Sequence, residues 1–213
     1  MVNFKINRLP NKHIVDRYLE TVQSLGVIND GKGLDYFVSP DDEVDVKTLP
    51  TSHHNGYVGF VIGGKYKTKC LPVEKIISIS KKINSPIILF GGKEDMEKAN
   101  TITKVVGCKI FNACGRYNIN QAASLVKQAK KIITHDTGLM HIAAAFKKDI
   151  VSIWGNTIPE FGMYPYLLDG NDQIIEIKDL SCRPCSKLGF DKCPKGHFKC
   201  MNLINEETMV NFS

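Results

Sequence analysis

From residue 57 to residue 177 the chain alternates between short apolar, β-branched segments and longer segments with apolar residues at helical spacing. Such alternation predicts parallel strands joined by crossover helices, and therefore an α/β, Rossmann-like parallel sheet with helices on both faces. Ligands of open parallel sheets bind beyond the carboxyl ends of the strands. We expect strands at 57–63, 86–90, 109–112, 131–134, 150–154 and 174–177, and helices at 73–83, 94–106, 119–129 and 138–146.

The first 55 residues are less regular. Apolar side chains at helical spacing between residues 11 and 26, with Gly26 as a stop, predict one amphipathic helix there. Residues 31–55 are rich in Asp, Pro and Gly and contain one candidate strand at 34–38.

Composition limits the class of protein. With 213 residues, 43% of them hydrophobic, the chain is long enough for one sizeable core. No segment approaches the roughly 18 to 20 apolar residues of a membrane span, and residues 1–8 lack the apolar centre of a signal peptide, so we expect a cytoplasmic protein. The formal net charge of +6 comes largely from scattered lysines, which favours solvated helix surfaces over a nucleic-acid interface.

The segment 131–145 (KIITHDTGLMHIAAA) joins an apolar strand to an Ala-rich helix through Asp136, Thr137 and Gly138. A turn of this kind points the free N–H groups and the positive dipole end of a helix at the carboxyl edge of the sheet, which favours phosphate. His141, in the first turn of that helix, is placed to donate to a phosphate oxygen. The simpler alternatives are that Asp136 is a helix N-cap and that His141 is packed or exposed.

Two other loops follow strands at the same edge of the sheet. Residues 63–69 (GGKYKTK) offer glycines for close backbone approach and lysines for phosphate charge, but they lack the order of a Walker A loop. In residues 91–94 (GGKE), Glu94 is placed to accept hydrogen bonds from ribose hydroxyls. Taken singly, Lys69 reads as a surface lysine and Glu94 as a residue that favours a helix start. Their convergence with the 136–138 turn predicts a nucleotide-diphosphate site.

These motifs resemble those of a known family. Residues 136–145 (DTGLMHIAAA), followed by 150–157 (IVSIWGNT), resemble the signature of glycosyltransferase family 9, the lipopolysaccharide heptosyltransferases. Residues 69–72 (KCLP) resemble its Lys-x-Trp-Pro loop with Leu71 in place of Trp, and residues 91–94 resemble its glycine-rich turn ending in Glu. Gly115 before the next helix also fits. The resemblance covers most of the chain and is strongest between residues 58 and 157.

The resemblance implies a GT-B enzyme, in which two Rossmann-like domains face each other and a heptose passes from ADP-heptose to the lipopolysaccharide inner core with inversion. This chain resembles the C-terminal, donor-binding half. Lys69 would then neutralise diphosphate charge and Glu94 would hold the ribose. Gly64 and Lys65 stand where the family often has hydroxyl residues, so we expect different phosphate contacts there. The donor diphosphate and sugar would be lined by Asp136, Thr137, Gly138 and His141.

The front of the chain departs from the family. Residues 1–55 supply no carboxylate at a strand end, so the general base is expected in a missing N-terminal domain or a partner chain, and the sequence is expected to be a fragment or a truncated reading frame. The implied mechanism needs no metal and no cofactor besides the donor substrate. The acceptor is expected at the inner membrane face. We divide the chain into 1–55 (helix and interdomain connector), 56–180 (nucleotide-sugar-binding domain) and 181–213 (a Cys-rich tail packing on that domain).

The tail contains four cysteines whose role is left open by their spacing, namely Cys182, Cys185, Cys193 and Cys200. Four thiols so close in sequence would suit tetrahedral zinc, but only the first two form a Cys-x-x-Cys pair, so reduced or paired thiols are favoured. The odd total of seven cysteines argues against a complete disulfide framework.

Two other classes of function remain as alternatives. A non-catalytic nucleotide-binding or interaction module fits a chain without an acceptor domain. Zinc-dependent nucleic-acid binding through the tail fits the charge, but the tail lacks interleaved aromatic residues and a known finger spacing, so no nucleic-acid partner is expected.

Overall fold

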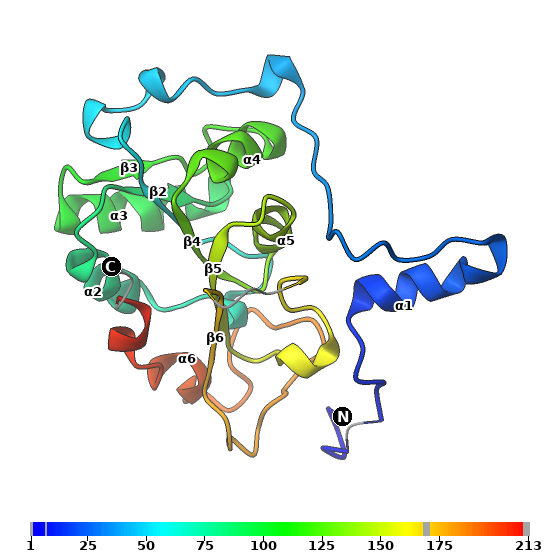
Figure 1. Ribbon diagram of the computed structural model, residues 1–213. Coiled ribbons are helices and arrows are strands. Elements are labelled where there is room, and N and C mark those ends of the chain that lie inside the picture. The colour runs from blue at the N-terminus through cyan, green and yellow to red at the C-terminus, as the bar shows by residue number, and fades with distance from the viewer. Residues whose placement is uncertain (1, 7, 168–170, 211–213) are drawn as a thin grey trace.

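A computed structural model describes residues 2–6, 8–167 and 171–210, and its centre is a six-stranded, wholly parallel sheet. The strand order is β3-β2-β1-β4-β5-β6, the doubly wound arrangement, which confirms the predicted α/β class (Figure 1). The strands are β1 (Val58–Val61), β2 (Ile87–Phe90), β3 (Ile110–Asn112), β4 (Lys131–His135), β5 (Asp149–Trp154) and β6 (Gln173–Glu176).

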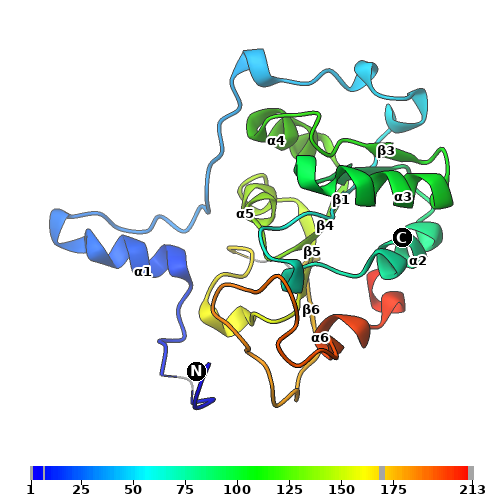
Figure 2. The same cartoon turned by 180° about the vertical axis from the view of Figure 1, so that it is seen from behind.

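Helices cover both faces of the sheet, as Figures 1 and 2 show from opposite sides. Side chains alternate across β1, so Phe60 packs in one core and Val61 in the other. The first core also holds apolar residues of α2 (Val73–Lys82) and α3 (Met96–Val106), and the second holds those of α4 (Ile119–Gln128) and α5 (Gly138–Ala145). β2 is buried along its whole length, which explains its continuous apolar sequence.

The chain reverses its winding direction between β1 and β4. β1 pairs with β2 on one side and with β4 on the other, and Gly59 lies level with Ile88 and Ile132. The loops that follow β1 and β4 therefore lead to helices on opposite faces, which leaves a crevice between them. The predicted phosphate loops are the two loops that flank this crevice.

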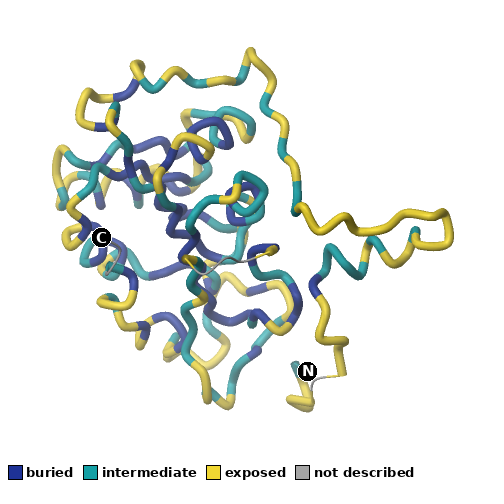
Figure 3. The backbone as a smooth tube through the Cα atoms, in the orientation of Figure 1, coloured by how far each residue is buried: buried dark blue, intermediate teal, exposed yellow. Residues whose placement is uncertain are grey.

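The N-terminal part differs from the sequence prediction. Residues 34–38 form no strand, and the helix predicted over 11–26 is shorter: α1 (Ile14–Thr21), followed by a 3-10 turn, Gln23–Leu25. None of the α1 residues is buried, so tertiary packing adds little to helix stability there, and short helices need such packing. Figure 3 shows α1 as a mostly half-buried helix, with exposed residues before and after it, in an arm beside the sheet.

The described helices are short. They run from the four residues of α6 (Lys199–Asn202) to the eleven of α3, and none is long and apolar enough to cross a membrane. The predicted helix start at Glu94 is also two residues early, because Lys93–Asp95 forms a 3-10 turn ahead of α3.

The tail contributes to the core beneath α2. Cys200, Met201 and Ile204 are each at most 4% exposed and belong to the same apolar cluster as α2 and α3. The ammonium group of Lys75 on α2 donates to the carbonyl of Ile204 at 2.9 Å and lies 3.4 Å from Glu206. The segment after residue 199 is therefore held by apolar burial and by polar contacts at its rim.

This packing predicts a stability difference between two neighbouring positions of the tail. Met201→Ala removes a fully buried side chain and should lower the free energy of unfolding by about 2–5 kcal/mol. Leu203→Ala is the matched control because Leu203 is 56% exposed, and its effect should be within about 0.5 kcal/mol. Urea unfolding measures both values. Equal effects would show that the tail does not pack on the sheet.

Candidate functional site

A cavity of about 550 Å³ opens at the carboxyl edge of the sheet, between the loops after β1 and β4. Glycines let the loops after β1 and β2 approach closely: a Cβ on Gly63 would lie 3.0 Å from the Cα of Gly91 and would overlap the Asp95 carboxylate. Of the residues predicted from sequence, four line the cavity: Gly64, Glu94, Thr137 and Gly138.

The other end of the cavity is apolar. Phe90, Ala113 and Leu139 line it together with Tyr117 and Ile119, which lie in the loop after β3 and in the first turn of α4. Apolar and aromatic walls of this kind suit a heterocyclic base. The sequence reasoning did not single out Tyr117 and Ile119. The sequence signal that could have identified them is their position just after the third predicted strand, which ends at the same edge of the sheet.

The N-terminus of α5 faces the cavity through Thr137 and Gly138. Thr137 is the N-cap residue, and its side chain makes no capping hydrogen bond to the helix backbone. The alternative interpretation of Asp136 as the N-cap is therefore wrong by one residue. An uncapped first turn offers N–H groups and a positive dipole end to an anion.

Asp136 lies beside the cavity, where its carboxylate joins two segments distant in sequence. Its Oδ2 accepts from the Lys69 ammonium at 2.6 Å and from the Thr157 hydroxyl at 3.0 Å. The Lys69 and Asp136 side chains are only 16% and 10% exposed, so water screens their attraction weakly. The structure brings the two predicted residues together, but as an ion pair and not as separate ligands lining the cavity.

His141 is half-buried on α5, also outside the cavity lining. Burial is the main cause of the lowered pKa of His141; the Lys69 ammonium and, when protonated, His13 also lower it, while Asp136 acts in the opposite direction. The imidazole is therefore neutral at pH 7 and adds no formal charge beside the cavity.

The sequence reasoning missed His135, which is fully buried at the end of β4. The backbone N–H of Leu71 donates to its Nε2 at 3.0 Å, so the ring ties β4 to the loop that carries Lys69. Burial lowers the pKa of His135 to about 3, which keeps the ring a neutral acceptor. A histidine between a strand and a phosphate loop gives no distinctive sequence signal.

Glu94 and Asp95 have different roles. Glu94 is exposed at the rim of the cavity, so its carboxylate is free to meet a ligand hydroxyl. Asp95 is 8% exposed, accepts from the backbone N–H of Gly92 at 3.0 Å and lies 3.1 Å from the Lys98 ammonium. Asp95 therefore fixes the glycine loop that presents Glu94.

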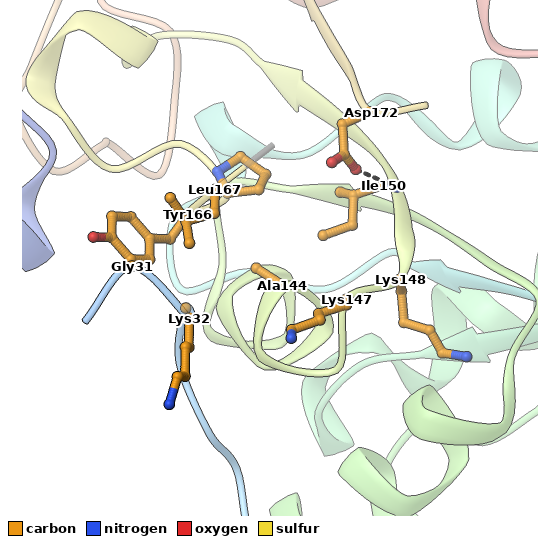
Figure 4. Close-up of a pocket in the computed structure, with 11 residues that line it drawn as sticks. Gly31, Lys32, Ala144, Lys147, Lys148, Ile150, Tyr166, Leu167 and Asp172 are labelled. Atoms are coloured by element: carbon orange, nitrogen blue, oxygen red, sulfur yellow. Dashed lines mark hydrogen bonds between the residues drawn. The ribbon is translucent and has the colours of Figure 1, made fainter. Parts of the chain in front are cut away.

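A second cavity, of about 370 Å³, lies at the other end of the sheet (Figure 4). Lys147 and Lys148 after α5, together with Tyr166 and Gly31 from the irregular segments, form part of its lining. It lies near the start of β5, whereas open parallel sheets bind ligands beyond the strand ends. The cavity at the carboxyl edge is therefore the candidate site.

The seven cysteines all carry free thiols. Within the part of the chain that the structure describes, no group of three or more His, Cys, Asp or Glu side chains is arranged to hold a metal ion. The zinc alternative for Cys182, Cys185, Cys193 and Cys200 thus has no formed site there. Cys200 points into the core, and burial raises the pKa of its thiol to about 11.

The sheet order, together with the glycine loops and the uncapped α5 at its carboxyl edge, defines an α/β domain of the doubly wound class. Sequence comparison gives the family. The family model described as glycosyltransferase family 9 (heptosyltransferase) matches residues 1–191, and the chain belongs to this family.

Curated relatives agree with this assignment. The chain is 30% identical over 128 residues to lipooligosaccharide heptosyltransferase 2 of Campylobacter jejuni, a match covering 58% of this chain and 38% of the relative. It is 26% identical over 164 residues to lipopolysaccharide heptosyltransferase 2 of Salmonella typhimurium, covering 70% and 47%. The matches thus span less than half the length of these relatives.

Solved structures share the fold. The family 9 glycosyl transferase of Veillonella parvula superposes with a TM-score of 0.75 at 23% identity, over 96% of this chain and 60% of that one. The Escherichia coli heptosyltransferase WaaC with ADP gives a TM-score of 0.63 at 20% identity, over 99% and 58%.

The burial of His135 predicts a pH dependence of stability. Its pKa is about 3 in the folded chain and near 6.5 when unfolded, so between these values the unfolded chain binds a proton that the folded chain does not. Stability should therefore fall as the pH drops from 6.5 towards 3. His135→Gln keeps an acceptor for the Leu71 N–H and should reduce the slope by up to about 1.4 kcal/mol per pH unit.

Urea unfolding of both proteins at several pH values between 7 and 4 measures the two slopes. His13, His53 and His141 also have lowered pKa values and should leave a residual slope in the variant. Identical slopes in the two proteins would contradict the assignment of His135 as a buried neutral acceptor.

Proposed function

We propose that this chain binds a nucleotide-diphosphate sugar, ADP-heptose, in the cavity at the carboxyl edge and forms the donor-binding part of a heptosyltransferase. The observation that carries the proposal is the uncapped N-terminus of α5, which lines one cavity with two glycine loops and an apolar wall. Relatives named as heptosyltransferases, and a fold shared with WaaC solved with ADP, support this choice of donor.

Each part of the donor has a matching part of the cavity. The base occupies the apolar end beside Tyr117 and Ile119, and the ribose hydroxyls donate to Glu94. The diphosphate lies against Gly64 and the first turn of α5, with Lys69 close behind. These donors stabilise the charge that grows on the diphosphate as it leaves, which is electrostatic preorganisation and calls for no separate cofactor.

The transfer reaction needs two further components. An acceptor hydroxyl oxygen attacks the anomeric carbon, the carbon–oxygen bond to the diphosphate breaks with its electron pair going to ADP, and a general base takes the hydroxyl proton. We assign that base to a further domain or a partner chain, because Asp136 is already occupied by Lys69 and Thr157. The proposed acceptor is the lipopolysaccharide inner core, reached at the cytoplasmic face of the membrane.

The role of Glu94 predicts a change in nucleotide selectivity. Glu94→Gln should weaken ADP binding about tenfold, because a carboxylate accepts ribose hydroxyls more strongly than an amide does. The wild-type protein should prefer ADP over 2′-deoxy-ADP, and the variant should lose most of that preference. Isothermal titration calorimetry gives the four Kd values. Glu97→Gln, which makes the same charge change nearby on α3, is the control and should leave ADP binding unchanged.

The Lys69–Asp136 pair predicts non-additive effects on the same measurement. Lys69→Gln removes the cation and leaves the Asp136 charge facing the diphosphate uncompensated, so ADP affinity should fall about tenfold or more. Adding Asp136→Asn removes that repulsion, so the double variant should bind ADP more tightly than the single variant. If the two substitutions each weakened ADP binding and their losses of binding free energy added in the double variant, the result would contradict the paired arrangement. A folded wild-type protein that binds no ADP would refute the proposed function itself.

A further inference from the structure

Arg183 is a buried cation that the proposed function does not use. It lies in the tail, and its side chain is only 5% exposed. Its Nη2 is 2.9 Å from the carboxylate of Glu176 on β6, whose side chain is 8% exposed. A buried ion pair needs further hydrogen bonds to offset its desolvation. The acceptors of the remaining guanidinium N–H groups therefore indicate which segments Arg183 holds in place.

Two of those donor nitrogens, Nε and Nη2, bind the loop that follows β5. Nε donates to the carbonyl of Gly155 at 2.5 Å, and Nη2 donates to the carbonyl of Thr157 at 2.9 Å. Nη1 donates to the carbonyl of Ile177, just beyond β6. The backbone N–H of Cys185 adds a bond to the carbonyl of Asn156 at 3.1 Å. The planar guanidinium thus fixes residues 155–157 from one side, with several donors in one plane.

The same loop carries the hydroxyl that reaches the candidate site. Thr157 is 1% exposed, and its hydroxyl donates to Oδ2 of Asp136 at 3.0 Å. That oxygen also accepts from Lys69 at 2.6 Å. One continuous set of contacts therefore runs from Arg183 through Thr157 and Asp136 to Lys69, from the tail to the N-terminus of α5.

We propose that Arg183 is a positioning residue for the diphosphate side of the donor site. It touches no ligand, and it acts by holding Thr157 where its hydroxyl fixes the Asp136 carboxylate and, through it, the Lys69 ammonium. The inference rests on the proposed function, since it assigns the Lys69–Asp136 pair to diphosphate binding. It gives the tail a role in the site that packing of its apolar residues alone does not require.

The test uses Arg183→Lys and Thr157→Val in the full chain. Lysine keeps the charge beside Glu176, but one ammonium group cannot serve the carbonyls of Gly155, Ile177 and Thr157 at once. Each variant should weaken ADP binding about tenfold by calorimetry. The double variant should be no weaker than either single variant, because both changes release the same carboxylate.

Two measurements separate positioning from a general loss of structure. Arg17→Lys is the matched control, because the Arg17 side chain also donates to a loop carbonyl, that of Phe161, outside the cavity; its Kd for ADP should equal the wild-type value. Amide hydrogen exchange without ligand should accelerate at residues 155–157 and 136–139 in Arg183→Lys, while the protection of Met201 is retained.

Two results would overturn the inference. One is an unchanged Kd for ADP in Thr157→Val, a variant that leaves the Arg183 contacts intact. The other is losses in the two single variants that multiply in the double variant. If the wild-type protein binds no ADP, the proposed function fails, and the exchange rates at residues 136–139 still decide whether Arg183 orders that turn.

Discussion

The parallel pairing of β1 with β4 determines where everything else in the domain lies. These strands are far apart in sequence. The chain first adds β2 and β3 on one lateral side of β1, and then returns to add β4, β5 and β6 on the other. The turns that follow the two strands therefore separate, and backbone N–H groups border the gap. The glycines after β1 and the first turn of α5 occupy that gap because the strand order puts them there.

The charges at this gap are arranged in compensated pairs. Lys69 is matched by Asp136, and Lys98 by Asp95, so little uncompensated side-chain charge is buried beside the cavity. The partial charges of the helix end then supply the attraction for an anion, and the ion pairs supply rigidity. Such a site keeps its geometry without ligand, because each buried charge already has a partner.

The sequence was sufficient to predict all six strands and four of the helices that cover them, because the strands are short segments rich in apolar, β-branched residues, α2, α3 and α4 have a clear apolar period, and α5 is rich in Ala. It also predicted the loops after β1, β2 and β4 that line the cavity, since glycines after strands are recognisable, but it did not single out Tyr117 and Ile119 after β3. It did not predict that Lys69 would pair with Asp136, that Thr157 would join them, or that His135 would hold the Leu71 N–H. These contacts join segments up to 67 residues apart, and they depend on side-chain directions that periodicity does not determine. The predictions of a strand at 34–38 and of a longer helix at α1 were wrong for a related reason. A local sequence pattern can predict an element, but the element forms only where tertiary packing stabilises it.

The burial of Cys200, Met201 and Ile204 beneath α2 has a consequence for how the protein is made. Translation proceeds from the N-terminus, so the strands and crossover helices leave the ribosome before the residues that cover this part of their core. Until residue 204 emerges, α2 and α3 expose an apolar surface that the native protein hides. Nascent chains paused at that stage are the species most open to aggregation and to capture by chaperones, and completion of the tail ends that exposure.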